Sequence, residues 1–97
     1  MFEVVFTPAA ALELVEAYDW YEAEFPGLGA RFQAEIDSTV ERTAANPLQF
    51  PAVLRGARRA LLRRFPYMLF FTVNDNNLLV IACLHVSRDP RIWRKRT

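Results

Sequence analysis

The second half of this 97-residue chain gathers side chains that could act on a phosphate group. His85 closes an apolar run and a basic tail follows it. Three of the arginines that lie earlier in the same half, together with a tyrosine, complete the set. The full set is Arg59, Arg63, Arg64, Tyr67, His85, Arg88, Arg91, Arg94, Lys95 and Arg96. Arginine holds phosphate with a planar fork of donors, and imidazole transfers protons near neutral pH. Such a set could cleave RNA, because RNA supplies its own nucleophile, the 2′-hydroxyl, and the enzyme adds only a base, an acid and positive charge.

The same residues also have simpler interpretations. A lone histidine on a strand is more often structural than catalytic, and an arginine-rich surface is often only solvated. Asp89-Pro90 is typical of a turn in which Asp89 accepts hydrogen bonds from backbone amides or from an adjacent arginine. Trp93 either packs on the sheet or stacks on a nucleic-acid base. Catalysis by His85 is therefore one hypothesis, and a purely binding role for this region is the other.

No metal and no cofactor are expected. The three glycines do not form a phosphate-binding loop, and one histidine two residues from one cysteine is half of a four-ligand metal site. Cys83 lies in an apolar run, where a thiol is usually buried and unreactive, and a single cysteine forms no disulfide within the chain. Because the chain can form no internal disulfide, we expect it in the reducing cytoplasm. No segment reaches the ~20 apolar residues that cross a bilayer, so no membrane partner is expected.

Charged residues are distributed unevenly along the chain. The formal net charge is only +1, yet residues 1–54 contain nine acidic and two basic side chains. Residues 55–97 contain two acidic and ten basic side chains, and nine of those ten are arginines. A basic surface of this kind predicts an acidic or polyanionic partner.

The first half of the chain predicts a strand followed by two helices. Residues 2–6 alternate as a short strand, and Thr7-Pro8 is a helix start that leads to a helix ending at about Glu24. The Pro26-Gly27-Leu28-Gly29 segment breaks that helix and starts another, which ends at Asn46-Pro47. A short turn between two helices predicts an antiparallel helical hairpin.

The second half predicts a loop and then three strands. The loop covers residues 48–56 and contains extended pieces. The strands cover 57–64, 67–73 and 78–86, and a tight turn lies at 74–77. The expected fold is α+β with element order β-α-α-β-β-β, a helical hairpin packed on one face of a small antiparallel sheet. We expect a single domain over residues 1–97.

The last two predicted strands are apolar on both faces. Strict alternation divides the final strand into Leu78, Val80, Ala82, Leu84 and Val86 on one face and Leu79, Ile81, Cys83 and His85 on the other. Two helices can cover only one face of such a sheet. The other face therefore needs a cover, which could be the C-terminal tail with Trp93, a second copy of the chain or a partner protein.

Taken together, these motifs resemble a known family. The element order contributes, as do the helix with Asp19-Trp20-Tyr21, the Pro26-Gly27-Leu28-Gly29 break and the Asn46-Pro47 stop. The specific part is Arg64-Phe65-Pro66-Tyr67 with His85-x-x-Arg88-Asp89-Pro90-x-x-Trp93. Over essentially its whole length, the chain is similar to the RelE/ParE superfamily. These proteins are the toxins of bacterial type II toxin–antitoxin modules and are often labelled plasmid stabilisation proteins.

The resemblance implies an antitoxin partner and one of two targets. Family toxins are neutralised by a small antitoxin whose partly disordered C-terminal segment wraps around the toxin. The antitoxin normally binds the operator DNA, so no operator binding is expected of this chain. RelE-like members cut mRNA in the ribosome, often with a C-terminal tyrosine, whereas ParE-like members poison DNA gyrase. This tail holds no tyrosine and a single lysine, Lys95, so the chain looks closer to ParE.

Three functions remain open on this resemblance. The favoured one is a ParE-like toxin that inhibits gyrase by binding, without a catalytic residue. Its target-binding residues would be Arg59, Arg63, Arg64, Tyr67, Arg88, Arg91, Trp93 and Arg94. The runner-up is a ribosome-dependent mRNA endoribonuclease, whose catalytic candidates are Arg64, His85 and Arg88. The third is a non-toxic interaction protein with the same fold.

Overall fold

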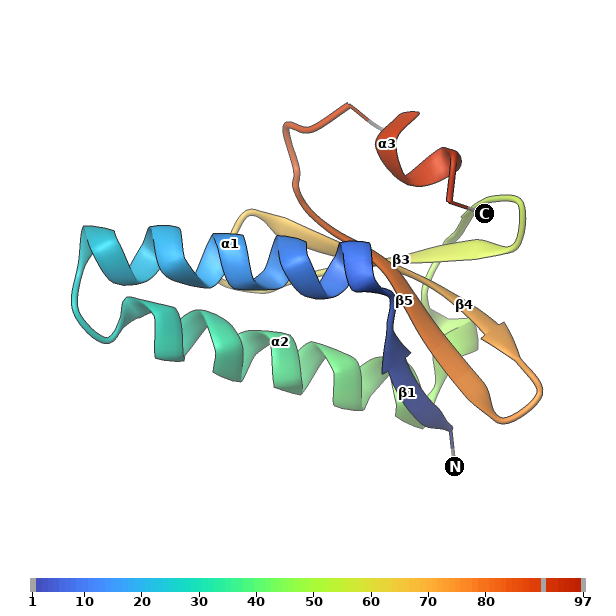
Figure 1. Ribbon diagram of the computed structural model, residues 1–97. Coiled ribbons are helices and arrows are strands. Elements are labelled where there is room, and N and C mark those ends of the chain that lie inside the picture. Colours follow the sequence, from blue (N-terminus) through green and yellow to red (C-terminus); the bar gives the residue numbers. More distant parts are fainter. Residues whose placement is uncertain (1, 90, 97) are drawn as a thin grey trace.

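The computed structural model describes residues 2–89 and 91–96, so that Met1, Pro90 and Thr97 lie outside the description. The elements in chain order are β1 (Glu3–Phe6), α1 (Pro8–Glu24), α2 (Leu28–Ala45), the 3-10 turn η1 (Pro47–Gln49), β2 (Ala52–Leu54), β3 (Ala57–Leu61), β4 (Tyr67–Asn74), β5 (Asn77–His85) and α3 (Arg91–Arg94). Figure 1 shows the two long helices side by side against the sheet. The α+β class and the helical hairpin are confirmed.

Local contacts explain where the two long helices begin. The Thr7 hydroxyl accepts a hydrogen bond from the Ala10 amide at 3.1 Å and so caps α1. Gly27 adopts a left-handed φ of 89° just before α2, a conformation that glycine takes without steric cost. The Glu22 carboxylate accepts from the Gly27 and Gly29 amides at 2.9 and 3.0 Å, which closes the turn between the helices. None of the helices within the described residues is long and apolar enough to span a membrane.

The sheet contains five strands in the order β1-β5-β4-β3-β2. The four strands from β2 to β5 are antiparallel to their neighbours, as expected, but β1 pairs in parallel with β5, with Val4 opposite Leu78. Parallel pairing needs a long connection between the two strands, and the helical hairpin with three intervening strands provides it. The edge strand β2 lies inside the segment that was expected to be a loop with extended pieces, and it is one of those pieces.

Each face of the sheet carries its own core. The helix-side core includes Phe32, Ile36, Leu69, Phe71, Leu78, Val80 and Cys83. The second core consists of Ala57, Met68, Phe70, Ile81, Ala82, Leu84 and Trp93, with Trp93 contributed by α3. The C-terminal tail is therefore what covers the second face, one of the three covers considered from the sequence. In Figure 1, α3 lies apart from the helical hairpin.

A β-bulge at Ile81 changes which side chains share a face. Phe70 pairs with Ala82, and Phe71 pairs with Val80, so Ile81 is an extra residue without a partner on β4. Because one extra residue reverses the alternation, the prediction that Val80 and Ala82 share a face was wrong. Val80 faces the helices, whereas Ala82 belongs to the second core.

Candidate functional site

The sheet separates the candidate chemical groups onto two faces. Arg59 pairs with Phe70 across β3 and β4, and Phe70 belongs to the second core. His85 pairs with Tyr67, whose ring lies 5.3 Å from the imidazole and packs against the helix-side core. The histidine and the strand arginine therefore point to opposite sides of the sheet.

A groove of about 530 Å³ lies on the second face, between β2 and α3. Its walls carry three of the predicted arginines, and its floor is apolar. The lining residues are Ala52, Val53, Leu54, Arg59, Met68, Phe70, Val86, Arg88, Trp93 and Arg94. We call this the arginine groove and define it by Arg59, Arg88, Trp93 and Arg94. The fold thus brings together four target-binding candidates that lie up to 35 positions apart in the chain.

Trp93 forms the floor of the arginine groove. It is only 3% exposed and stacks on Phe70, with ring centroids 4.6 Å apart and an interplanar angle of 14°. The Arg94 guanidinium carbon lies 5.9 Å from the centre of the Trp93 ring, within cation–π range. Of its two sequence-based interpretations, packing on the sheet is the one that the geometry shows.

Arg59 brings an unsatisfied donor to the same groove. Its Nε atom is buried and, among the described residues, finds no hydrogen-bond partner. Buried donors are normally paired, because an unpaired one loses its hydration without compensation. The groove carries the positive charge of Arg59 and its neighbours, which suits an acidic group, whereas the Nε atom itself is shielded from solvent.

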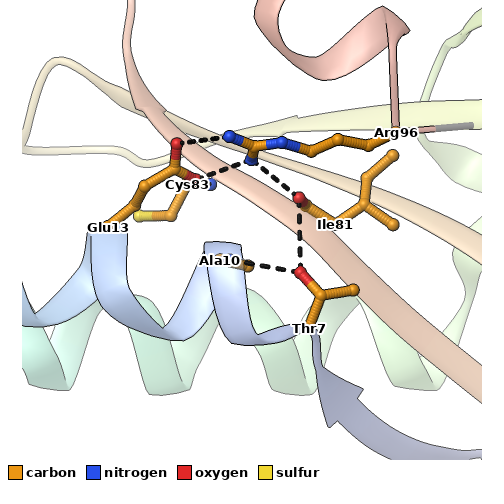
Figure 2. Close-up of polar contacts among 6 residues, drawn as sticks. All are labelled: Thr7, Ala10, Glu13, Ile81, Cys83 and Arg96. Atoms are coloured by element: carbon orange, nitrogen blue, oxygen red, sulfur yellow. Dashed lines mark hydrogen bonds and ion pairs between the residues drawn. The ribbon is translucent and has the colours of Figure 1, made fainter.

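The wall formed by α3 is fixed by an ion pair that crosses the open edge of β5. Arg96 Nη1 donates to Glu13 Oε1 and to the Ile81 carbonyl, each at 2.9 Å, and Nη2 donates to Glu13 Oε2 at 3.0 Å. Glu13 Oε1 also accepts from the Cys83 amide at 3.1 Å. Figure 2 shows these groups converging from α1, β5 and the tail. We call this network the Arg96–Glu13 latch.

Hydrogen bonding defines the state of the His85 ring. The Ser87 backbone amide donates to Nδ1 at 3.1 Å, and the Ser87 hydroxyl lies 2.8 Å from the same nitrogen. Since an amide can only donate, Nδ1 must be an acceptor, and the neutral ring carries its proton on Nε2. The free nitrogen of His85 is then a donor rather than a lone pair, which does not suit a general base.

Arg63 and Arg64 lie elsewhere. They were expected on a strand, but β3 ends at Leu61, and both residues occupy the bend that follows. The Arg64 amide donates to Glu35 Oε1 at 2.9 Å, and its side chain lines a separate cavity of about 730 Å³ beside α2. The interruption by Phe65-Pro66 ends the strand earlier than the arginine run suggested.

Arg91 also points away from the groove. It donates to Asp89 through its backbone amide at 2.9 Å and through Nη2 at 2.7 Å, and both side chains are exposed. These hydrogen bonds hold the pKa of Asp89 at about 2. The prediction that Asp89 bonds an adjacent arginine is confirmed, while Pro90, the other half of that turn motif, lies outside the described residues.

Sequence reasoning missed most of the apolar part of the groove. Met68 and Phe70 were recognised as one apolar face of a strand, but not as the floor of a binding site. The Ala52–Leu54 segment was predicted as part of a loop with extended pieces, but not as a wall of the groove. Within residues 2–89 and 91–96, no cluster of three histidine, cysteine or carboxylate side chains could hold a metal.

The chain is similar both to a protein-family model and to solved structures. A family model described as "ParE toxin of type II toxin-antitoxin system, parDE" matches residues 4–90. Among solved structures, the chain is similar to one described as "Chromosomal ParDE TA system from P. aeruginosa". The TM-score is 0.76 at 22% identity, and the match covers 88% of this chain and 96% of the other. No curated protein matches the sequence.

Proposed function

The chain belongs to the ParE toxin family of type II toxin–antitoxin systems, and on that premise we propose that it stops growth by binding DNA gyrase. In this proposal the protein acts in the cytoplasm, and a cognate antitoxin neutralises it. The arginine groove makes the central contact with the target. No side chain of the toxin takes part in covalent chemistry.

The observation that carries this proposal is the separation of His85 from the arginine groove. Cleavage of RNA by the 2′-hydroxyl needs a base, an acid and positive charge around one phosphate. Here the imidazole lies on the helix side of the sheet, and Arg59 and Arg94 line the opposite face. Arg64, a further candidate for a ribonuclease, lines a third surface. Of the two arginines proposed for a ribonuclease, only Arg88 lies near His85, because it borders both the groove and the cleft beside the imidazole. One cation beside the imidazole is less positive charge than the groove gathers, and binding needs no convergence on one phosphate, so the geometry favours a binding toxin over a ribonuclease.

The composition of the groove indicates what the target must offer. The guanidinium groups of Arg59 and Arg88 favour carboxylate acceptors, and the Trp93 floor favours an apolar surface. Charged anchors around an apolar centre are typical of protein–protein contact sites. An acidic protein segment with an apolar anchor matches both requirements.

A first experiment induces the chain alone in a bacterial host and pulse-labels DNA and protein synthesis over the first minutes. The expected result is that DNA synthesis falls first. Phe70→Asp is the inactive control, because it buries a carboxylate against Trp93 and disrupts the second core. If protein synthesis falls first, the ribonuclease alternative replaces our proposal. If neither falls, the chain is a non-toxic protein with this fold.

A second experiment tests the groove directly with purified gyrase in a supercoiling assay. Arg59→Gln and Arg88→Gln should each raise the concentration needed for half inhibition by about tenfold, the equivalent of ~1.4 kcal/mol of binding energy. Arg63→Gln is the matched control, because it removes the same charge from an exposed position outside the groove. Equal effects of all three substitutions would show that net charge, and not the groove, governs inhibition.

A further inference from the structure

A second cleft lies on the opposite side of the sheet from the arginine groove, where the C-terminal half of α1 meets the end of β5. One part, of about 600 Å³, is lined by Trp20, Tyr21, Pro66, Tyr67, His85, Ser87 and Arg88. An adjoining part of about 220 Å³ shares Trp20, Tyr67, His85 and Arg88 with it and extends toward Glu13 and Glu16. We call the two parts together the aromatic cleft and define it by the four residues that they share.

Hydrogen-bond donors converge at one end of the aromatic cleft. His85 presents its Nε2–H, because Ser87 occupies the other ring nitrogen. Tyr67 remains a neutral phenol, since burial raises its pKa further above the physiological range, with Arg88 opposing that shift. The Arg88 guanidinium adds a positive charge to the same lining. Two neutral donors and one cation form a suitable receptor for an oxyanion.

An exposed tryptophan flanks these donors. Trp20 is 59% exposed, although its ring meets the edge of Tyr21 with centroids 5.1 Å apart. A large aromatic surface left in water beside a polar cleft is characteristic of a protein-binding site. The ligand is therefore expected to carry an apolar group next to its oxyanion.

The acidic side chains nearby restrict the ligand to a single negative charge. Glu16 lines the far end of the cleft, and the exposed Asp19 follows on the same helix. Glu13 adds little negative charge, because Arg96 pairs with it. A phosphate or a phosphodiester chain brings more negative charge and would be repelled by these carboxylates. A ligand with a single carboxylate can place that group at Arg88 and keep its uncharged parts near Glu16.

We propose that the aromatic cleft binds an acidic side chain of a protein partner, with the carboxylate at His85 and Arg88 and an adjacent apolar side chain on Trp20. This site goes beyond the proposed function, because it lies on the other face of the sheet. It shares only Arg88 with the arginine groove. It requires no particular toxin target.

The test is an NMR titration of the isotope-labelled full chain with short capped peptides. The probes are acetyl-Leu-Glu-Leu-amide, its glutamine analogue acetyl-Leu-Gln-Leu-amide, inorganic phosphate and adenosine monophosphate. We expect the glutamate peptide to shift the Trp20 indole and His85 ring signals saturably. The glutamine peptide should bind about tenfold more weakly, as expected for a lost charge-assisted contact. Equal binding of both peptides, or no shift at all, overturns the proposal.

Variants locate the contact within the cleft. Arg88→Gln should weaken the glutamate peptide about tenfold, whereas Arg91→Gln, which removes the same charge from a residue outside the cleft, should leave it unchanged. His85→Phe removes the Nε2–H and keeps the ring shape, so it tests the site even if Arg88→Gln fails to fold. Preferential binding of phosphate or the nucleotide would identify a phosphate site and overturn the assignment. Because the titration contains no gyrase, its outcome is independent of the proposed function.

Discussion

At the scale of single residues, burial and neighbours decide which chemically capable side chains remain reactive. Cys83 is 1% exposed and faces the helix-side core, as its apolar sequence context predicted. Burial, and then the charge of Glu13, raise the pKa of its thiol from 9.0 to about 12. The nucleophilic thiolate is therefore essentially absent from the folded protein near neutral pH.

This leads to a prediction for alkylation. Iodoacetamide at about pH 8 should leave Cys83 unmodified in the folded chain and modify it quickly once denaturant unfolds the protein, because unfolding restores an ordinary thiol. Mass spectrometry across a denaturant series measures the modified fraction. Rapid modification without denaturant would show that β5 opens readily.

The same pKa shift predicts how stability depends on pH. Because the folded pKa lies above the unfolded value, the unfolded thiol deprotonates first as the pH rises. The free energy of unfolding should therefore fall between about pH 9 and 12, and Cys83→Ala should flatten this part of the profile. Urea melts of both proteins across that range provide the measurement, and identical profiles would contradict the assignment.

At the scale of elements, the short helix α3 depends on one ion pair and one ring stack. The Arg96–Glu13 latch is largely buried, with side-chain exposures of 24% and 16%. It ties the tail to α1 and satisfies the Ile81 carbonyl and the Cys83 amide on the edge of β5 that β1 does not reach. The latch thus protects a sheet edge while it holds Trp93 in place.

Substitution of Arg96 tests this role. Arg96→Ala should cost about 1–3 kcal/mol, because it leaves a mostly buried carboxylate and a carbonyl without their charged donor. Trp93 should then become partly solvated, with a red shift in its fluorescence. Lys95→Ala, at the exposed neighbouring position, is the control. An unchanged spectrum in Arg96→Ala would show that ring stacking alone secures α3.

The helical hairpin offers a second prediction at this scale. A Cβ atom on Gly29 would lie 2.9 Å from Glu22 Oε1 and 3.0 Å from the Tyr18 carbonyl. Helix propensity favours alanine by up to ~1 kcal/mol, but close contact with fixed backbone typically costs about 1–3 kcal/mol. Gly29→Ala should therefore lower the melting temperature, and a rise would mean that the hairpin relaxes easily.

Sequence reasoning predicted the elements better than their relations. Local contacts determine the helix ends at Thr7-Pro8, Gly27 and Asn46-Pro47. These ends could therefore be predicted directly from the sequence. The bulge at Ile81 is set by the fit between β4 and β5, which no local pattern encodes. The bulge changes which side chains of the last strand share a face of the sheet. It therefore also changes which side chains can meet in the candidate site.

The site itself was predictable only as a set of residues. Arginine content singled out Arg59, Arg88 and Arg94, and these do meet in one groove. Their separation from His85 depends on strand register, and the position of Arg64 depends on where β3 ends. Both are tertiary properties that the sequence pattern did not contain.

At the scale of the whole molecule, charge is divided between two sides. The acidic residues lie mostly on α1 and α2, and most of the basic residues lie on β3, the following bend and the tail. The molecule is 39 Å long, several times the Debye length of ~10 Å at 0.1 M salt. An approaching partner therefore responds to the electrostatic potential of the side that faces it, and not to the net charge of +1.

This division predicts how target binding responds to salt. If the basic side docks on an acidic target, the association rate with gyrase should fall steeply between about 0.05 and 0.5 M salt, while the dissociation rate changes little. Surface plasmon resonance separates the two rates. A salt-independent association rate would argue against electrostatic steering by the basic side.

The parallel pairing of β1 with β5 also has a consequence for synthesis in the cell. The first strand, β1, cannot pair until the last strand, β5, has been synthesised. Glu13 likewise cannot form its ion pair until Arg96 has been synthesised. Contacts this distant in sequence close late and fold slowly. Until β5 has been synthesised, β4 and its aromatic residues have no complete sheet to join. A growing polypeptide of this kind is a natural client for chaperones, because the aromatic side chains of β4 stay exposed until β5 pairs with it.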